Sequence, residues 1–526
     1  MADKKTTRRG LLGTGGMATL LGGGGAMAGP LKTGPEIYQS IGVEPVINCR
    51  GTYTIIGASI ELPEVRAAMD AAALHFVQLD ELAEGVGKRL AELTGAEWGM
   101  VSAGCAAGLK HVTAACVAGG NPEKLLRIPN LEGMEKTEVV APRSSRSAYD
   151  HAIRNIGVRM ITVETAEEFE RALSKRTAMI YLSAGRATEA GPMSLENAAR
   201  MAAPWHIPIL VDAAAEGLTI PNVHLARGAT VVAYSGGKAI CGPQCAGLLL
   251  GKKDLLLSAW QASSPHHGPG RDNKVGREET MGMVAAVEAW VKRDHKAEWA
   301  KWLGYLDTIA KRVGAIDGVS TRVVEPAGLS NRTPALAISW DPERLHVTGE
   351  ELAEVVARTK PRIALGARRD GVDITAWMMQ AGNDRVVAER LFSLLSEKRT
   401  PKGAPAAPAG NLTGRWDVDV TFFSSQSRHA WTLEQDGNAL KGTHKGDFSV
   451  RDIFGTLEGG EVKLRSMESV PGDSITFTFS GVLRGDRLEG RVHMGEYLTA
   501  SFAATRHVDS GRKGTILVPG GPPLSN

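Results

Sequence analysis

Residues 399–410 form a Pro- and Ala-rich segment that divides this chain into two parts of different pattern. Such a composition predicts a stiff, solvated linker. Before it, apolar runs alternate with stretches of helical periodicity; beyond it, short runs alternate polar and apolar residues. A doubly wound sheet needs helices between its strands, whereas a barrel or sandwich does not. The chain is therefore predicted to hold an α/β unit followed by an all-β unit.

The part before the linker is long enough for a large domain and a smaller lobe. Residues 38–290 alternate predicted strands and helices, as in a mostly parallel sheet with helices on both faces. A long helix at 283–313 is predicted to lead into an α+β lobe at 291–398, with a strand at 335–340 and a closing helix at 384–395. A ligand is expected at the carboxyl edge of the parallel strands.

Residues 411–507 predict an appended β-barrel or sandwich. The runs 416–422 and 475–479 have the alternation of strands, and Asp436-Gly437 and Gly459-Gly460 are typical hairpin turns. This region shows no catalytic set of side chains. Binding of a partner, a glycan or an apolar ligand, or a purely stabilising role, all stay open.

One lysine stands where a strand is predicted to end. Lys238 follows the apolar run 230–233 and then Ser235-Gly236-Gly237. At such an edge an amine can form a Schiff base, the bond that anchors pyridoxal phosphate (PLP) in enzymes. Upstream, the apolar run 207–211 ends in Asp212, and a carboxylate there can keep the pyridinium nitrogen protonated. A solvated lysine and a turn-capping aspartate are the alternatives.

Residues 98–118 predict a short strand, a turn of small residues and a helix. The N–H groups at a helix N-terminus bind phosphate without a cationic side chain. Close packing of helix on sheet is the alternative explanation for the small residues. Ser235 is a candidate for one further hydrogen bond to the phosphate. The candidate phosphate ligands in the turn are Ser102, Gly104, Cys105 and Ala106.

These separated segments resemble the fold-type-I PLP-dependent enzymes of the selenocysteine synthase (L-seryl-tRNA selenium transferase) and D-glucosaminate-6-phosphate ammonia lyase-like family. The resemblance covers about residues 37–395 and is stronger toward the ammonia lyase branch. The segments that carry it include 149–154, 211–216, 235–238, 242–244 and 274–279. It implies that Lys238 holds PLP, that Asp212 faces the pyridinium nitrogen, and that the turn and Ser235 hold the phosphate. It also implies a homodimer or higher homo-oligomer.

Two positions depart from the pattern of the family. Ser145 precedes Arg146 where relatives often have a histidine, so the residue that stacks on the cofactor ring is not assigned. Cys241 stands where relatives often have an arginine. Both positions lie near the expected cofactor pocket, and the substrate or even catalytic competence can therefore differ from that of the named relatives.

Charged residues near these segments are candidates for substrate binding. Arg271 and Lys274 lie in a predicted loop that contains glycine and could bind a substrate carboxylate or phosphate. The alternative is that both side chains are solvated and bind no ligand. Arg146 is a further candidate, and Glu216 is a candidate to act on a substrate proton.

Histidine and cysteine spacing predicts neither a metal site nor a disulfide framework. His266 and His267 have no third ligand at a recognised spacing. Five cysteines are too scattered for a framework. Cys241 and Cys245 could form a strained bridge, or Cys241 could be a thiol in the pocket. The other three, Cys49, Cys105 and Cys116, are expected to be small buried apolar residues.

Both ends of the chain have a distinct composition. Residues 1–28 combine Arg8-Arg9 with a Gly-rich stretch and a small-x-small end at Ala26-Met27-Ala28, which predicts a twin-arginine export signal and a periplasmic or extracellular protein. A membrane-spanning helix fits less well because of the many glycines, and a disordered basic tail is a third reading. The tail at 508–526, rich in Gly and Pro, is predicted to be disordered.

Net charge bears on the class of substrate. Removal of residues 1–28 would take away four of the 61 lysines and arginines and one of the 58 aspartates and glutamates, which leaves a formally neutral chain. Neutrality argues against tRNA or another nucleic acid as the substrate, because binding to its phosphates is favoured by clustered basic side chains. The mature form is expected to have no membrane span.

The sequence thus predicts an exported PLP-dependent lyase. The resemblance implies α,β-elimination on an amino acid or amino-sugar acid. A selenium transferase-like or aminotransferase-type PLP enzyme is the first alternative. The second is a catalytically inactive extracytoplasmic binding protein that works through its β-domain.

Overall fold

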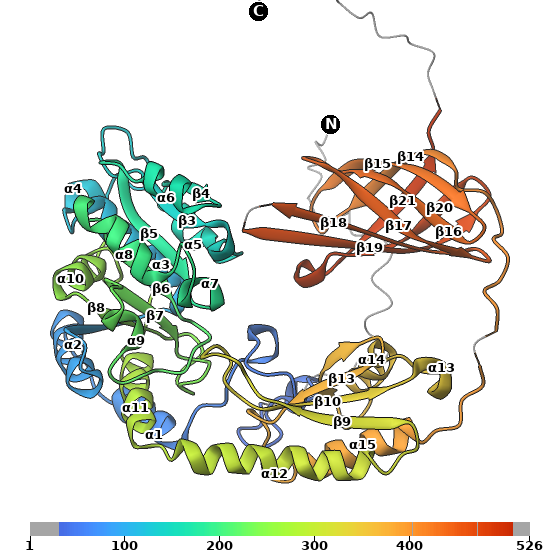
Figure 1. Cartoon of the computed structure of the whole chain (residues 1–526), viewed down its shortest axis with the longest axis horizontal. Coiled ribbons are helices and arrows are strands. Elements are labelled where there is room, and N and C mark those ends of the chain that lie inside the picture. Colours follow the sequence, from blue (N-terminus) through green and yellow to red (C-terminus); the bar gives the residue numbers. More distant parts are fainter. Residues whose placement is uncertain (1–30, 402, 471, 509–526) are drawn as a thin grey trace, which may run out of the picture.

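The computed structural model describes residues 31–401, 403–470 and 472–508. The predicted export signal and nearly all of the predicted tail lie outside these residues. The described chain comprises an α/β domain, a smaller lobe at the lower right of the view and a barrel joined to that lobe by an extended segment (Figure 1).

A seven-stranded sheet forms the centre of the large domain, with the order β2-β8-β7-β6-β5-β3-β4. Only β8 runs antiparallel to its neighbours, so the carboxyl ends of the other six strands meet at one edge. The predicted mostly parallel sheet is confirmed. Its strands are β2 (Trp98–Ser102), β3 (Glu138–Pro142), β4 (Arg159–Val163), β5 (Thr177–Ser183), β6 (Ile209–Asp212), β7 (Val231–Ser235) and β8 (Gly247–Gly251).

Helices cover both faces of this sheet because its strands are apolar on both sides. Along β7, Val231 and Ala233 pack into one core, whereas Val232 and Tyr234 pack into the other. The core that contains Val232 is covered by α1 (Pro63–Ala73), α2 (Leu79–Thr94), α6 (Ala166–Ala172), α8 (Leu195–Ala202) and α11 (Arg277–Lys292). The other core is covered by α3 (Cys105–Ala118), α4 (Pro122–Leu125), α5 (Asp150–Arg154) and α10 (Lys253–Gln261). The short helices α7 (Arg186–Glu189) and α9 (Val223–Ala226) lie in the connections after β5 and β6.

The helix predicted at 283–313 is two helices, and this part of the prediction was wrong. α11 ends at Lys292, Arg293 has an extended backbone, and α12 (His295–Val313) then begins. Asp294 caps α12, since its carboxylate accepts hydrogen bonds from the N–H groups of Lys296 and Ala297. The apolar periodicity continues across this break, which is why the sequence pattern did not reveal it.

The smaller lobe has a four-stranded antiparallel sheet with the order β12-β13-β10-β9. The predicted strand at 335–340 is β10, and the predicted closing helix lies within α15 (Asn383–Leu395). The other elements are β9 (Val319–Val324), β10 (Ala335–Trp340), β12 (Gly366–Arg368), β13 (Gly371–Thr375), α13 (Pro342–Leu345), α14 (Gly349–Arg358) and the pair β1 (Ile47–Asn48) with β11 (Ile363–Ala364). Arg362, between α14 and β11 of this lobe, donates to the carbonyl groups of Ala357 and Glu44.

The C-terminal unit is a closed barrel of eight antiparallel strands, which decides between the predicted barrel and sandwich. Closure comes from the pairing of the first strand with the last. Both predicted hairpin turns are present, because Asp436 pairs with Ala439 and Glu458 with Glu461. The strands are β14 (Gly414–Thr421), β15 (Gln426–Asp436), β16 (Ala439–Lys445), β17 (Val450–Glu458), β18 (Glu461–Val470), β19 (Asp473–Arg484), β20 (Arg487–His493) and β21 (Thr499–Arg506).

Across the described residues, no helix combines the length and apolar character needed to cross a membrane.

Candidate active site

Asp212 ends β6 as a buried carboxylate with three donors around it. Its Oδ1 accepts hydrogen bonds from the Ala214 N–H at 3.0 Å and the Cys105 thiol at 3.6 Å. Its Oδ2 accepts from the Tyr181 hydroxyl at 3.0 Å. Burial raises the pKa of Asp212, and the hydrogen bonds together with the charge of Lys238 oppose that rise. The donors therefore fix the carboxylate in one orientation at the carboxyl edge of the sheet.

Lys238 lies just beyond the end of β7, the strand next to β6. Its charge lowers the pKa of both Asp212 and Cys105, which places the lysine within electrostatic range of each. Among the residues that the structure describes, its amine has no hydrogen bond or ion pair. The lysine thus approaches the buried carboxylate with its amine uncommitted.

The glycines before the lysine allow a close approach of the chain. A Cβ atom on Gly236 would lie 2.7 Å from the Ala246 carbonyl oxygen, and one on Gly237 would lie 2.7 Å from Cα of Gln244. The Gly237 carbonyl also accepts a hydrogen bond from the Ser59 N–H at 2.9 Å. This packing explains why the loop has no larger residue at these two positions, and it fixes the backbone from which Lys238 projects.

The N-terminus of α3 is the third element of the site. Gly104 is its N-cap residue, has φ of 88° and offers no side chain to the first N–H groups of the helix. A Cβ atom on Gly247 would clash with the Gly104 carbonyl group, so the sheet also approaches this turn closely. The Ser102 hydroxyl donates to the Gly104 carbonyl at 2.8 Å and thereby stabilises the turn. Cys105, the first residue of α3, contacts Asp212.

This arrangement fits PLP. The donor set at the start of α3 suits a phosphate, the buried Asp212 suits a cationic ring nitrogen, and the Lys238 amine suits the aldehyde. Ser235, half-buried at the end of β7, lies on the same edge of the sheet. The structure thus brings together Lys238, Asp212, Cys105 and the turn before α3, as the sequence predicts.

Arg146 lies on the same edge, in the segment that follows η3 (Arg143–Ser145). The Ser145 Oγ accepts a hydrogen bond from the Ser183 N–H at 3.0 Å, and Ser183 pairs with Asp212 across β5 and β6. The Arg146 guanidinium is nearly buried and donates to Asp150 and Thr162. Its contact with a substrate stays a prediction.

The other predicted substrate residues have different surroundings. Glu216 is buried against His224, with 2.6 Å between its Oε2 and the His224 Nε2, so it has a partner within the fold. Arg271 and Lys274 are exposed on the loop after α10, where the Arg271 guanidinium reaches the Ser264 hydroxyl at 3.5 Å. In the part of the chain that is described, no hydrogen bond or ion pair joins these two residues to Lys238 or Asp212. Their roles stay predictions.

All five cysteines are free thiols in the structure. Cys241 is buried, and its thiol donates to the Ala239 carbonyl at 3.6 Å, whereas Cys245 is exposed. Burial raises the pKa of Cys241. Of the alternatives for this pair, the structure has the buried thiol and not the bridge.

Tyr181 is a site residue that sequence reasoning missed. It is fully buried in β5, and its hydroxyl is a donor to the Asp212 carboxylate. Burial and the charge of Asp212 raise its pKa, so the hydroxyl stays protonated and can donate. The only signal in the sequence is an aromatic hydroxyl within an otherwise aliphatic strand, which is equally consistent with core packing.

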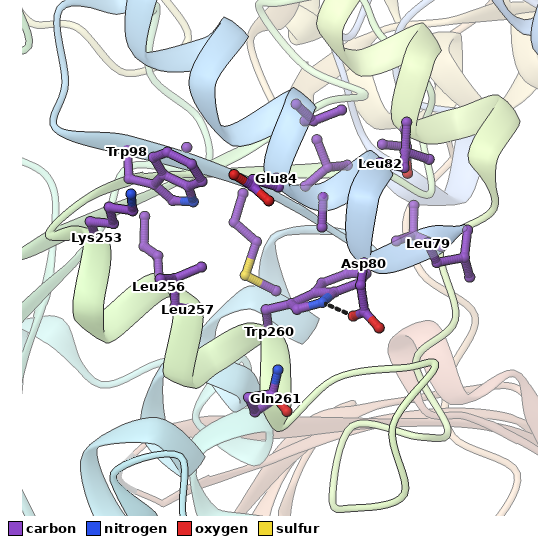
Figure 2. A pocket seen from close by; sticks show the side chains of 17 residues that line it. Leu79, Asp80, Leu82, Glu84, Trp98, Lys253, Leu256, Leu257, Trp260 and Gln261 are labelled. Carbon is purple, nitrogen blue, oxygen red and sulfur yellow. Dashed lines mark hydrogen bonds between the residues drawn. The ribbon is translucent and has the colours of Figure 1, made fainter. Parts of the chain in front are cut away.

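A separate apolar cavity of about 310 Å³ lies between α2, β2 and α10 (Figure 2). Two of its polar contacts lie within its own wall: the Trp260 Nε1–H donates to Asp80 at 2.7 Å, and the Lys253 amine lies 4.4 Å from the centre of the Trp98 ring. The cavity does not include Lys238 or Asp212.

Comparisons with curated proteins give three informative relatives. The chain is 32% identical over 295 residues to a D-glucosaminate-6-phosphate ammonia lyase of Salmonella typhimurium, a match over 54% of this chain and 77% of that protein. It is 30% identical over 342 residues to a 5'-C-glycyluridine monooxygenase-decarboxylase of a Streptomyces species, over 62% of this chain and 83% of the relative. An L-seryl-tRNA(Sec) selenium transferase of Hyphomonas neptunium is 27% identical over 260 residues, or 44% and 54% of the two chains.

Among solved structures, a D-glucosaminate-6-phosphate ammonia-lyase matches with a TM-score of 0.62 and 26% identity. The match covers 69% of this chain and 99% of the other. No family model matches the chain. This protein therefore belongs to the fold-type-I PLP-dependent enzymes of the D-glucosaminate-6-phosphate ammonia lyase and selenocysteine synthase-like family, and it is an ammonia-lyase-like enzyme.

Proposed function

We propose that this enzyme is an exported lyase that acts on an amino acid or amino-sugar acid by α,β-elimination. The observation that supports it most is the convergence of an uncommitted Lys238 amine, the oriented Asp212 carboxylate and the N-terminus of α3. The relative with 32% identity is an ammonia lyase, which supports the reaction class. We expect its substrate to be a small molecule.

PLP would be held by Lys238 through its aldehyde, by Asp212 at its ring nitrogen and by the N–H groups at the start of α3 through its phosphate. When bound, PLP supplies an acceptor for the electron pair left after a Cα–H bond breaks. In this proposal the substrate amine takes the place of Lys238 on PLP, and the freed Lys238 amine takes up the α-proton. Its charge acts on Asp212, and its amine has no hydrogen bond or ion pair in the described chain. Loss of a leaving group at Cβ leaves an unsaturated amine, and its tautomerisation and hydrolysis by water give an oxo-acid and ammonia.

Asp212 has an electrostatic role in the proposal. A carboxylate next to the ring nitrogen favours its protonated form, and the opposite charge would in turn hold Asp212 ionised against the effect of burial. Tyr181, Cys105 and the Ala214 N–H keep the carboxylate in place.

Two other PLP activities would use the same residues. The selenium transferase relative and the monooxygenase-decarboxylase relative suggest that one site can serve several reactions. A tRNA substrate is disfavoured because the chain without residues 1–28 is formally neutral. An inactive binding protein is a weaker proposal, since it would have no need for the Lys238 and Asp212 pair.

Replacement of Lys238 tests the proposal directly. The purified protein should show a visible absorbance band that Lys238→Ala lacks, and activity should fall by about a thousandfold or more because the attachment point and base are lost. Activity is measured as ammonia and oxo-acid released from a panel of D- and L-amino acids and amino-sugar acids. Lys292→Ala, which removes an exposed lysine paired with Glu288, is the control and should change neither readout. A colourless wild-type protein that does not take up added PLP would contradict the proposal.

Replacement of Tyr181 tests how Asp212 is held. The Tyr181 hydrogen bond lowers the pKa of Asp212, so Tyr181→Phe should raise that pKa and move the acid limb of the kcat/KM profile to higher pH. Tyr234→Phe is a matched control, because Tyr234 is equally buried in the sheet and its hydroxyl instead accepts from Asn222 at 2.7 Å. Identical acid limbs in wild type and Tyr181→Phe would count against this role.

Export through the twin-arginine route rests on residues 1–28, which lie outside the described structure. Arg8-Arg9 and the small-x-small end support it, and the route suits an enzyme that takes up its cofactor before transport. Replacing both arginines by lysine should retain the protein in the cytoplasmic fraction. Cell fractionation measures this, and equal periplasmic amounts of both forms would refute export by this route.

A homo-oligomer is supported by an exposed apolar loop between α1 and α2. This loop exposes three large apolar side chains: Leu74 is 79% exposed, Phe76 is 96% exposed and Val77 is 50% exposed. Such a cluster of exposed apolar side chains is unusual on the surface of a monomer. We expect a second copy of the chain to cover them. Phe76→Asp should shift the sedimentation coefficient toward that of a monomer, whereas Phe454→Asp on the barrel exterior should not. A wild-type protein that sediments as a monomer would contradict this part of the proposal.

A further inference from the structure

The edge of the barrel meets the large domain beside the candidate active site. In Figure 1, β18 and β19 extend from the barrel toward α5. A cavity of about 600 Å³ lies between the two domains. The large domain contributes Arg143, Arg146 and Ser147 to its wall, and the barrel contributes Ser469, Ser474 and Glu496.

The contact beside this cavity is tight. Gly472 immediately precedes β19 and is buried. A Cβ atom on Gly472 would clash with Asp150 Oδ2 and lie 3.0 Å from the Ser147 carbonyl oxygen. Asp150 is fully buried there and accepts from the Arg146 guanidinium. Any side chain at position 472 would therefore push the barrel away from α5.

The same cavity wall connects to the strand ends of the candidate site. Ser145, next to Arg146, bonds to Ser183 at the end of β5, and Ser183 pairs with Asp212. Tyr149 follows in the same segment and is 54% exposed. Burial raises the pKa of Tyr149, and the charges of both Asp212 and Glu496 raise it further. Tyr149 is thus within electrostatic range of the active-site carboxylate on one side and of the barrel on the other.

We propose that this cavity is the outer part of the path to Lys238, and that the edge of the barrel determines which substrates enter it. The inference rests on the proposed function, because it takes Lys238 as the reacting group. The guanidinium, hydroxyl and carboxylate groups of the wall suit a small substrate with both charges and hydroxyl groups. An apolar side chain is disfavoured, since it would displace water from these polar groups without replacing its hydrogen bonds. The appended barrel then acts as a specificity element of the same chain.

Two glycine substitutions in the full-length protein distinguish the effect of losing the contact between the domains from the effect of backbone strain. Gly472→Val introduces both a clash with α5 and strain, since Gly472 has φ of 90°. Gly485→Val, in the turn between β19 and β20, introduces the strain alone: its φ is 62°, and a Cβ there would have no atom within 4 Å. Hydrogen exchange of residues 143–154 should rise about tenfold in Gly472→Val and stay unchanged in Gly485→Val.

Chemical access to Lys238 is the second measurement. Hydroxylamine and O-benzylhydroxylamine both release PLP from a lysine, and the reaction changes the absorbance of PLP. The two reagents differ in size, since O-benzylhydroxylamine is the bulkier. In Gly472→Val the rate ratio of the bulky to the small reagent should rise by about fivefold or more, because the entrance widens. An unchanged ratio overturns the proposal, even if hydrogen exchange rises. Equal responses of the two glycine variants in both measurements overturn it as well.

A charge reversal provides a variant that leaves the packing of the contact intact. Glu496 is exposed at the cavity, so Glu496→Lys should fold and should speed the reaction of anionic aminooxyacetate relative to neutral hydroxylamine by about twofold to fivefold. Glu461→Lys, at the opposite end of β18, is the control and should leave this ratio unchanged. No change in Glu496→Lys, or the same change in both, contradicts the proposal.

Failure of the proposed function would be distinguishable from failure of this inference. If the protein binds no PLP, the reagent measurements have no signal and the proposed function fails. Hydrogen exchange of residues 143–154 in Gly472→Val would still decide whether the barrel covers this edge of the sheet. If PLP is bound and the reagent ratios do not respond, only the role assigned to the barrel fails.

Discussion

The position of Asp212 is the constraint on which the site depends. A buried carboxylate is costly unless it is hydrogen-bonded or paired with a positive charge. Here three donors come from three elements: Tyr181 from β5, Cys105 from α3, and the Ala214 N–H from the chain after β6. Lys238 comes from the end of the neighbouring strand β7. These groups meet only because six strands of the sheet end at the same edge, so the fold itself assembles the site.

The barrel adds a wall to this edge from a part of the chain distant in sequence. Its own core buries Trp416, Trp431 and Phe479. The same interior also holds the hydrogen-bonded side chains of His429, His444 and Ser466. Its contact with the large domain depends instead on a glycine, because only a residue without a side chain lets the barrel approach Asp150. In the proposed arrangement the barrel narrows the entrance to the site, so this chain can differ from its relatives in substrate.

Much of the fold and part of the site could be predicted from the sequence. Apolar runs that end in Asp212 and before Lys238 mark neighbouring strand ends, and period-two alternation after the linker marks the barrel. The break at Asp294 could not be predicted, since apolar periodicity continues across it. Tyr181 gave no distinctive signal because a buried tyrosine is common in cores. The contact of Gly472 with Asp150 depends on how two domains pack, and glycine before a strand is equally typical of an ordinary turn.

Chemical trapping of the bond between PLP and Lys238 tests the proposed active site most directly. The purified full-length protein would be treated with borohydride, digested and analysed by mass spectrometry. A pyridoxyl adduct is expected on the peptide that contains Lys238, and on no other lysine. An adduct elsewhere, or none at all in a protein that has been supplied with PLP, would contradict it.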